Sequence, residues 1–164
     1  MTTNLGLAGK VAKHVELETV VLKRATIESD FEPDAPPQEI GLSQQYRCRY
    51  ERKGEPSADR VTIWVDFQFF AKKIEAGEEI GDAVKLDATF VLTYSLPSDL
   101  TIEEHCFQHF AEVNGPYNAW PYWRELVQSA TGRVGLSGIT VPVYRPPKRE
   151  VDDLPCVASA IDSE

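Results

Sequence analysis

The stretch that decides the fold is residues 115–135, whose aromatic first part is Tyr117-Asn118-Ala119-Trp120-Pro121-Tyr122-Trp123-Arg124-Glu125. At about 100° per residue its apolar side chains fall on one arc, and this periodicity predicts an amphipathic helix. The arc consists of Ala119, Trp120, Trp123, Leu126, Val127, Ala130 and Val134. Asn118 is the expected N-cap, which places Pro121 in the first turn, where proline costs little. Gly135 follows the last apolar position and is the expected C′ glycine.

The composition indicates one ordinary water-soluble domain. The chain has 164 residues, of which 42% are hydrophobic and 26% are charged, and this length suits one core rather than two. The formal net charge of −9 argues against nucleic acid as a partner, because phosphates attract a surplus of lysine and arginine. No apolar run is long enough for membrane insertion, and the start of the chain lacks a signal-peptide pattern. The three cysteines, Cys48, Cys106 and Cys156, are widely separated, which favours a reducing, cytoplasmic location over a disulfide framework.

Four strand-like runs precede the aromatic stretch. In each run apolar and polar side chains alternate, and short polar turns separate the runs. The runs are residues 14–27, 38–53, 60–73 and 83–96. Strands first and helices afterwards predict an α+β fold, in which a four-stranded antiparallel sheet is followed by a short and a long helix packed on one face.

The remaining segments complete the expected domain organisation. Thr101-Ile102-Glu103-Glu104 has the pattern of a capping box, so a short helix is expected from there to Val113, closed by Asn114-Gly115. Residues 1–13 are expected to be a flexible N-terminus, residues 14–145 the domain, and residues 146–164 a C-terminal tail.

The sheet is expected to carry more apolar side chains than two helices can cover. Beyond the face that packs on the helices, the opposite face would carry Val20, Leu22, Trp64, Phe70 and Val91. Because a monomer rarely exposes a large apolar patch, this surplus predicts an oligomer or a binding surface.

The best enzyme-like constellation is His105, His109 and Glu112, which helical spacing would place on one face, where they could ligate zinc. The zinc-protease motif is missing, because Cys106 rather than glutamate follows His105, and a polar helix flank explains the three residues more simply. Cys106 falls on the buried arc of its helix, where a thiol is usually a small hydrophobe. The sequence also contains no phosphate loop, nucleophile elbow or dinucleotide fingerprint. We therefore expect no enzyme activity, no catalytic residue, no cofactor and no metal.

Three segments carry a resemblance to a known family. They are Tyr117 to Glu125, Gly132-Arg133-Val134-Gly135 and Ile139-Thr140-Val141-Pro142. Together they resemble the signature region of the SecB family, and most closely its divergent SecB-like branch. In that family a Pro-Tyr-x-Arg-Glu segment opens the long helix, and a Leu/Val-x-Pro segment follows a glycine-containing break. The order of four strands and two helices agrees over residues 14–145.

The resemblance implies an ATP-independent holdase that binds unfolded precursor polypeptides for export through the Sec translocase and delivers them to SecA. It also implies a homotetramer, arranged as a dimer of dimers. Some members of the branch serve toxin–antitoxin systems, so an antitoxin is the alternative partner. Glu28 is the expected partner-docking residue, although Lys23 and Arg24 stand near where the family has an acidic residue.

Client-binding residues are expected to be apolar, because unfolded clients share exposed apolar side chains and free backbone groups. The candidates are Ile40, Leu42, Trp64, Tyr94, Trp120, Tyr122 and Trp123. By the resemblance, Ile40, Leu42 and Tyr122 fall near groove positions of the family, while Trp64 and Tyr94 rest on aromatic character and strand position. Trp120 is expected at the mouth of the groove, and a plain core role is the alternative for both helix tryptophans.

Two functions of other classes stay open at the level of sequence. One is a carrier of a small apolar ligand, with a pocket between sheet and helix. The other is a purely structural oligomerisation domain.

Overall fold

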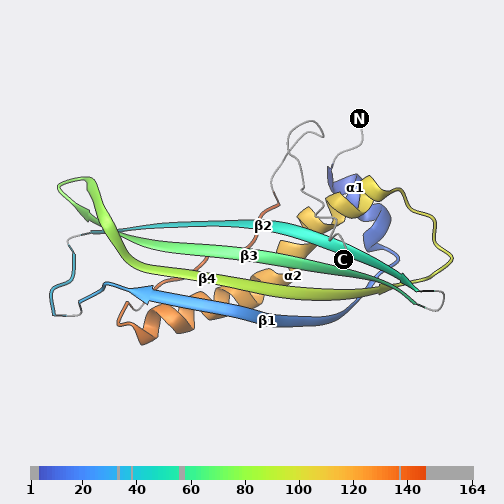
Figure 1. The fold of residues 1–164 in the computed structure, drawn as a ribbon. Helices are drawn as coiled ribbons and strands as arrows, with labels where there is room; N and C mark the ends of the chain where they lie inside the picture. Colours follow the sequence, from blue (N-terminus) through green and yellow to red (C-terminus); the bar gives the residue numbers. More distant parts are fainter. Residues whose placement is uncertain (1–3, 33, 38, 56–57, 137, 147–164) are drawn as a thin grey trace, which may run out of the picture.

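One antiparallel sheet packs against one long helix, and a short helix lies beside the start of the long one (Figure 1). The computed structural model describes residues 4–32, 34–37, 39–55, 58–136 and 138–146. In chain order its elements are α1 (Asn4–Ala12), β1 (Glu16–Ser29), β2 (Glu39–Glu55), β3 (Ala58–Glu75), β4 (Glu78–Leu96) and α2 (Glu104–Arg133). The strands are ordered β1-β4-β3-β2. The predicted α+β fold with a four-stranded antiparallel sheet is therefore confirmed.

α2 covers one face of the sheet, which we call the inner face. In β3 every second side chain is buried and the intervening ones are only partly covered. The buried β3 side chains are Val61, Ile63, Val65, Phe67, Phe69 and Ala71. β4 repeats this alternation from Val84 to Leu96. The two central strands and α2 therefore supply most of the core. Burying each of its large apolar side chains stabilises the folded state by about 1.5–3 kcal/mol.

α2 is one continuous helix where the sequence predicts two. It passes through Asn114, Gly115 and Pro116 without a break, so Asn114-Gly115 is not a helix end and Asn118 is not a cap. The local prediction is wrong because tertiary packing outweighs the helix-breaking tendency of glycine and proline. Gly115 lies directly against β3, where an added Cβ would come within 2.8 Å of Ile63 Cγ2.

The two ends of α2 differ in how well the sequence predicts them. The N-cap is Glu103, without a side-chain capping bond, so the expected capping box at Thr101 does not form. The expected C′ glycine is confirmed, because Gly135 has a φ of 88° and its N–H donates to the Gly132 carbonyl. Neither α1 nor α2 has the length and apolar character needed to cross a bilayer.

Residues 4–12, which the sequence analysis assigns to a flexible N-terminus, form the helix α1 in the structure. Leu7, Ala8 and Val11 are buried, and α1 packs against α2, beside the first turns of that helix (Figure 1). The spacing of these three residues is that of one helix face. Nine residues are too few for a helix that is stable by itself, so the contact with α2 decides its formation.

β1 departs from simple alternation. Its pairing with β4 shifts register twice, once before Val20 and once after Leu22, and each shift changes which side chains face inward. Val20 and Leu22 are therefore paired with the inner-face residues Leu92 and Phe90. The prediction that they lie on the opposite face, with Trp64, is wrong.

Candidate polypeptide-binding surface

Beyond α2 the chain reverses direction and returns along the helix. Gly135 and Gly138 lie in this reversal with φ angles of 88° and 81°, left-handed conformations that glycine adopts without steric cost. The returning segment, residues 138–146, belongs to no helix or strand, and we call it the strap. It is the orange-red segment beside α2 in Figure 1.

The strap runs antiparallel to α2, on the side of the helix that faces β2. As the strap advances, its contacts step backward along the helix. In order they are Val141 with Arg124, Pro142 with Trp120, and Tyr144 with Tyr117. The same strap also contacts β2, because the hydroxyls of Tyr144 and Tyr46 lie 3.0 Å apart.

Two side chains of α2 hold the backbone of the strap. Trp120 Nε1 donates to the Pro142 carbonyl at 2.7 Å, and Arg124 Nε donates to the Val141 carbonyl at 2.7 Å. Both acceptors are main-chain atoms, which every polypeptide offers. Neither bond therefore depends on the identity of the strap side chain at that position.

Tyr144 occupies an aromatic site between α2 and β2. Its ring centroid lies 5.1 Å from that of Trp120, 6.0 Å from that of Tyr46 and 6.3 Å from that of Tyr117. Burial raises the pKa of Tyr144, and its hydrogen bond with Tyr46 acts in the same direction. Neighbouring rings in such tilted geometries attract one another beyond their buried area, so this site favours an aromatic side chain.

The two tryptophans of α2 have different roles. Trp123 is fully buried and stacks on Phe67 at 4.9 Å, while its Nε1 donates to Gln44 Oε1 at 3.1 Å. It is part of the core in this structure. Trp120 is 7% exposed and lies between Phe67 and the strap, so the strap covers the residue that was expected at a groove mouth.

Ile40 and Leu42 extend this side of the inner face along β2. They pair with Lys73 and Ala71 of β3, and they follow the same alternation as Tyr46. Leu42 is 50% exposed and Ile40 is half-buried. The structure therefore places Ile40 and Leu42 on the β2 side of the inner face, and their client-binding role stays a prediction.

Tyr122 lies on the other side of α2. It is 50% exposed, and its ring is 6.4 Å from that of Phe90 on β4. Beside it β1 presents inner-face side chains that α2 leaves exposed, namely Leu17, Leu22 and Ile27. The sequence analysis does not include these β1 residues among the candidates for the site. Alternation predicts only that the apolar face of a strand is covered by other parts of the protein, and here α2 leaves that face of β1 exposed.

Tyr94 is a core residue in the structure. It is 2% exposed, Asn118 Nδ2 donates to its hydroxyl at 2.8 Å, and its ring meets Phe110 edge-on at 5.0 Å. Burial raises the pKa of Tyr94 to about 12, while the hydrogen bond from Asn118 acts in the opposite direction. A client could reach this side chain only if the core opened.

Trp64 and Glu28 lie on the outer face, away from the strap. Trp64 is half-buried beneath Arg49, whose guanidinium carbon is 5.2 Å from the ring centroid. Glu28 is exposed and pairs across the sheet with Lys85. Trp64 is thus not brought together with the other client-binding candidates, and the docking role of Glu28 stays a prediction.

The outer face has a hollow of about 370 Å³ near its centre. Its walls carry Arg24, Arg47, Asp66 and Asp87. Asp66 accepts a hydrogen bond from Thr89 Oγ1 at 2.6 Å and lies 3.4 Å from Arg47. This hollow is charged and lies on the outer face, so it is not the apolar pocket between sheet and helix that the carrier hypothesis expects.

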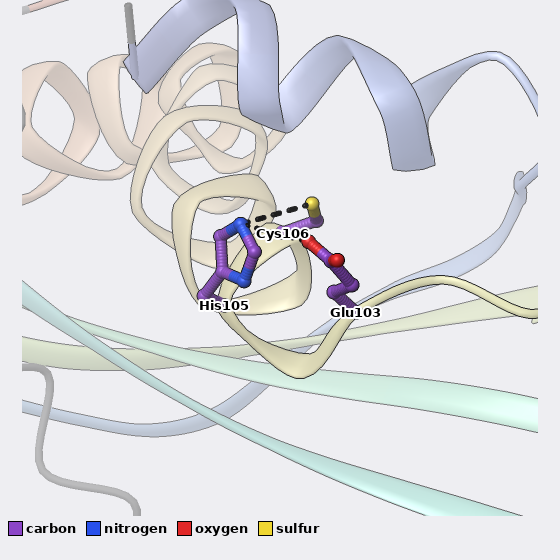
Figure 2. Close-up of side chains that lie close together, drawn as sticks. All are labelled: Glu103, His105 and Cys106. Atoms are coloured by element: carbon purple, nitrogen blue, oxygen red, sulfur yellow. Dashed lines mark hydrogen bonds and ion pairs between the residues drawn. The ribbon is translucent and has the colours of Figure 1, made fainter. Parts of the chain in front are cut away.

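The histidines of α2 are arranged differently from the expected zinc-like set. Figure 2 shows three side chains meeting at the first turn, where His105 Nε2 lies 3.3 Å from Glu103 Oε2 and 3.7 Å from Cys106 Sγ. His109 pairs instead with Glu112, at 3.4 Å. An exposed histidine–carboxylate contact beside a buried thiol accounts for the cluster in Figure 2, and the absence of a metal stays a prediction.

Tyr46 and Tyr144 are the residues that sequence reasoning missed on the strap side. Tyr46 was visible only as one of several inward-facing aromatics of its strand. Tyr144 follows a proline-containing segment that lacks any periodicity. The uninterrupted apolar run Val141-Pro142-Val143-Tyr144 was the signal that could have indicated an extended, docked segment, because proline disfavours a helical conformation of the residue before it.

Comparison with solved structures places this arrangement in a known fold. The chain is similar to the SecB-like chaperone Rv1957 of Mycobacterium tuberculosis, solved in complex with a ChAD peptide from the Rv1956 HigA1 antitoxin. The TM-score is 0.71 at 15% sequence identity, and the match covers 86% of this chain and 98% of that one. The chain therefore has a SecB-like fold.

Other comparisons add little. A protein of unknown function from Streptococcus agalactiae is 14% identical with a TM-score of 0.43, over 78% of this chain and 96% of that one, which is too weak a likeness to support an argument. No protein-family profile matches the chain, and no curated protein sequence matches it.

Proposed function

We propose that this protein is a SecB-like chaperone, an ATP-independent holdase that binds extended apolar segments of unfolded polypeptide. In this proposal its principal client is an antitoxin of a toxin–antitoxin system. It is not an enzyme and uses no cofactor. Binding depends on apolar contact and on main-chain hydrogen bonds, neither of which requires nucleotide.

The observation that carries the proposal is apolar surface left exposed on the inner face, on both sides of α2. Leu42 on one side and Leu22 with Tyr122 on the other are at least two-fifths exposed. Soluble proteins rarely expose such surface without a binding partner. A formal net charge of −9 keeps a protein soluble in spite of it.

The antitoxin is favoured over export precursors by the structural likeness, since the similar Mycobacterium chaperone was solved with an antitoxin peptide. The outer face supports the same choice. Glu28, the expected SecA-docking residue, has Lys85 opposite it and Arg24 on the same strand, so this surface has mixed charge. General binding of precursors for export through SecA is the second candidate.

The holdase activity is tested by diluting a chemically unfolded model precursor into buffer with stoichiometric protein and no nucleotide, while turbidity is recorded. We expect suppressed aggregation. Leu42→Asp should weaken client affinity by about 1–2 kcal/mol, because binding is spread over many contacts. Full suppression of aggregation by Leu42→Asp would exclude the β2 side of the inner face as the binding surface.

The matched control is Ile80→Asp, whose side chain is exposed to a similar degree, 53%, but lies near the start of β4, close to the β3–β4 turn. Both variants should keep the melting temperature of the wild type. No suppression by several-fold excess protein, together with strong stabilisation by one small apolar ligand, would make the protein a carrier instead.

The identity of the client is tested separately, by mass spectrometry of polypeptides that co-purify with the wild type and with Leu42→Asp. An antitoxin chaperone should retain one predominant short client that the variant loses. A broad set of precursors with signal sequences would favour the export function.

A further inference from the structure

The strap shows how the surface between α2 and β2 holds a length of extended chain. Trp120 and Arg124 bind main-chain carbonyls, and these bonds can be made to any polypeptide in the same conformation. The side of α2 that carries them also carries the aromatic site. We call the surface formed by Tyr46, Tyr117, Trp120 and Arg124 the strap seat.

Three apolar side chains of the strap are buried or half-buried, namely Ile139, Val141 and Tyr144, and the last two belong to residues that contact the seat. Val141 is 4% exposed, and Tyr144 is half-buried among three rings. Pro142 and Val143, which lie between them, are exposed, with Val143 at 60%. The seat therefore selects an aliphatic residue followed three positions later by an aromatic residue, and it leaves the positions between them unrestricted.

We propose that the strap is an internal substitute for a client, and that a client segment enters the seat by displacing it. The proposal rests on the proposed chaperone function and specifies the class of segment recognised. That segment is extended and has an uncharged aliphatic residue and an aromatic residue in the places of Val141 and Tyr144.

The attachment of the strap makes such an exchange physically reasonable. It takes part in no helix or strand, so its release breaks no regular hydrogen-bond ladder. Gly138 is the first residue of the strap, and Gly135 lies shortly before it. Glycine allows the change of backbone dihedral angles that release of the strap requires. In the absence of a client the strap covers Trp120, which would otherwise add to the exposed apolar surface.

Competition by the strap has a measurable consequence. When the binding-competent state is only a fraction of the population, the apparent affinity falls by that fraction. A substitution that weakens the strap without changing the seat should therefore tighten the binding of any peptide that uses the seat. A strap that merely completes the core would show no such gain.

The test uses a fluorescently labelled synthetic peptide with the sequence of residues 138–146, titrated with full-length protein and followed by fluorescence polarisation. Tyr144→Ser removes the ring contacts of the strap and its bond to Tyr46, so we expect the variant to bind the peptide at least about ten-fold more tightly than the wild type. Val143→Ser, at an exposed strap position, should bind like the wild type. A peptide with serine in place of both Val141 and Tyr144 should not bind either protein.

Equal affinity of the wild type and Tyr144→Ser for the peptide overturns the proposal. If circular dichroism shows that Tyr144→Ser is unfolded, Tyr144→Phe replaces it, and the loss of the bond to Tyr46 should then give a smaller gain in the same direction. The absence of any gain in that variant overturns the proposal equally.

The peptide assay contains no unfolded precursor, so its outcome is separate from that of the aggregation assay. Peptide capture by Tyr144→Ser without suppression of aggregation by any form would refute the chaperone function and leave the seat established. Suppression of aggregation without peptide capture would refute the exchange and leave the chaperone function intact.

Discussion

At the scale of single residues, Gly115 marks a close approach of α2 to the sheet. An added Cβ would lie 2.8 Å from Ile63 Cγ2 and 3.4 Å from Val65 Cγ2, both in the middle of β3. Glycine in a helix interior is normally unfavourable by about 0.5–1 kcal/mol relative to alanine. Its presence here is explained by the space that it leaves for β3.

We therefore expect Gly115→Ala to destabilise the protein by about 1–3 kcal/mol, the usual effect of overpacking a core. Gly132→Ala is the control, because a Cβ added there would meet no other part of the protein within 4 Å, and it should be neutral or stabilising by up to about 1 kcal/mol. Urea unfolding of both variants measures the difference. Equal stabilities would show that α2 can move away from β3 without loss.

The raised pKa of Tyr94 predicts how the stability of the folded protein changes at alkaline pH. Burial raises its pKa to about 12 in the folded protein, above the value of about 10 for an exposed tyrosine, so the folded state holds this proton more tightly than the unfolded state. The resulting stabilisation is complete below about pH 10 and is lost as the pH rises toward 12.

Tyr94→Phe separates this effect from general alkaline unfolding. At pH 8 it should destabilise the protein by about 1–2 kcal/mol, because Asn118 Nδ2 loses its acceptor. Between pH 10 and 12 the stability of the variant should fall less steeply than that of the wild type. Parallel stability curves across this range would contradict the proposed burial of the phenol.

At the scale of elements, α1 and α2 stabilise one another. The buried side chains of α1 are Leu7, Ala8 and Val11, whereas Leu5 is 62% exposed. The chain thus offers two leucines in one short helix with opposite environments, and this pair allows a direct test of the contact with α2.

Leu7→Ala should destabilise the protein by about 2–5 kcal/mol, the usual range for truncating a buried leucine. Leu5→Ala should change stability by less than about 0.5 kcal/mol, as substitutions at exposed positions do. Thermal and urea unfolding provide the comparison. A small effect of both would mean that α1 detaches easily and that residues 4–12 add little to the core.

At the scale of the whole molecule, β1 is the element that a single chain leaves incomplete. It is an edge strand of 14 residues, and it exposes apolar side chains on both faces, including Val21 on the outer face and Leu22 on the inner face. Exposed apolar edges tend to pair with other chains. This is the physical support for the expected homotetramer, a dimer of dimers.

Light scattering coupled to gel filtration should therefore show four chains of 18.4 kDa per particle. The double variant Val21→Lys/Leu22→Lys should form smaller particles, because lysines on an edge strand oppose strand pairing. Ile80→Lys, at another exposed apolar position, should keep the wild-type mass. A stable wild-type monomer at micromolar concentration would contradict the tetramer.

The sequence by itself determined the four-stranded sheet and the buried faces of its two central strands. Alternation in residues 60–73 and 83–96 is a local property, and it correctly identified the buried faces of β3 and β4. The C′ glycine at Gly135 was equally predictable, because a left-handed residue after a helix is a local requirement. Aromatic content also identified Trp120 as a site candidate.

Only the tertiary structure decided the features that depend on contacts between distant segments. The continuity of α2 through Gly115 and Pro116 depends on packing against β3, and the formation of α1 depends on α2. The separation of Trp64, Tyr94 and Trp120 into the outer face, the core and the strap seat likewise required the assembled sheet. The periodicity of apolar residues predicts which side chains are buried. It does not predict which distant segment covers them, because that depends on contacts formed only in the folded chain.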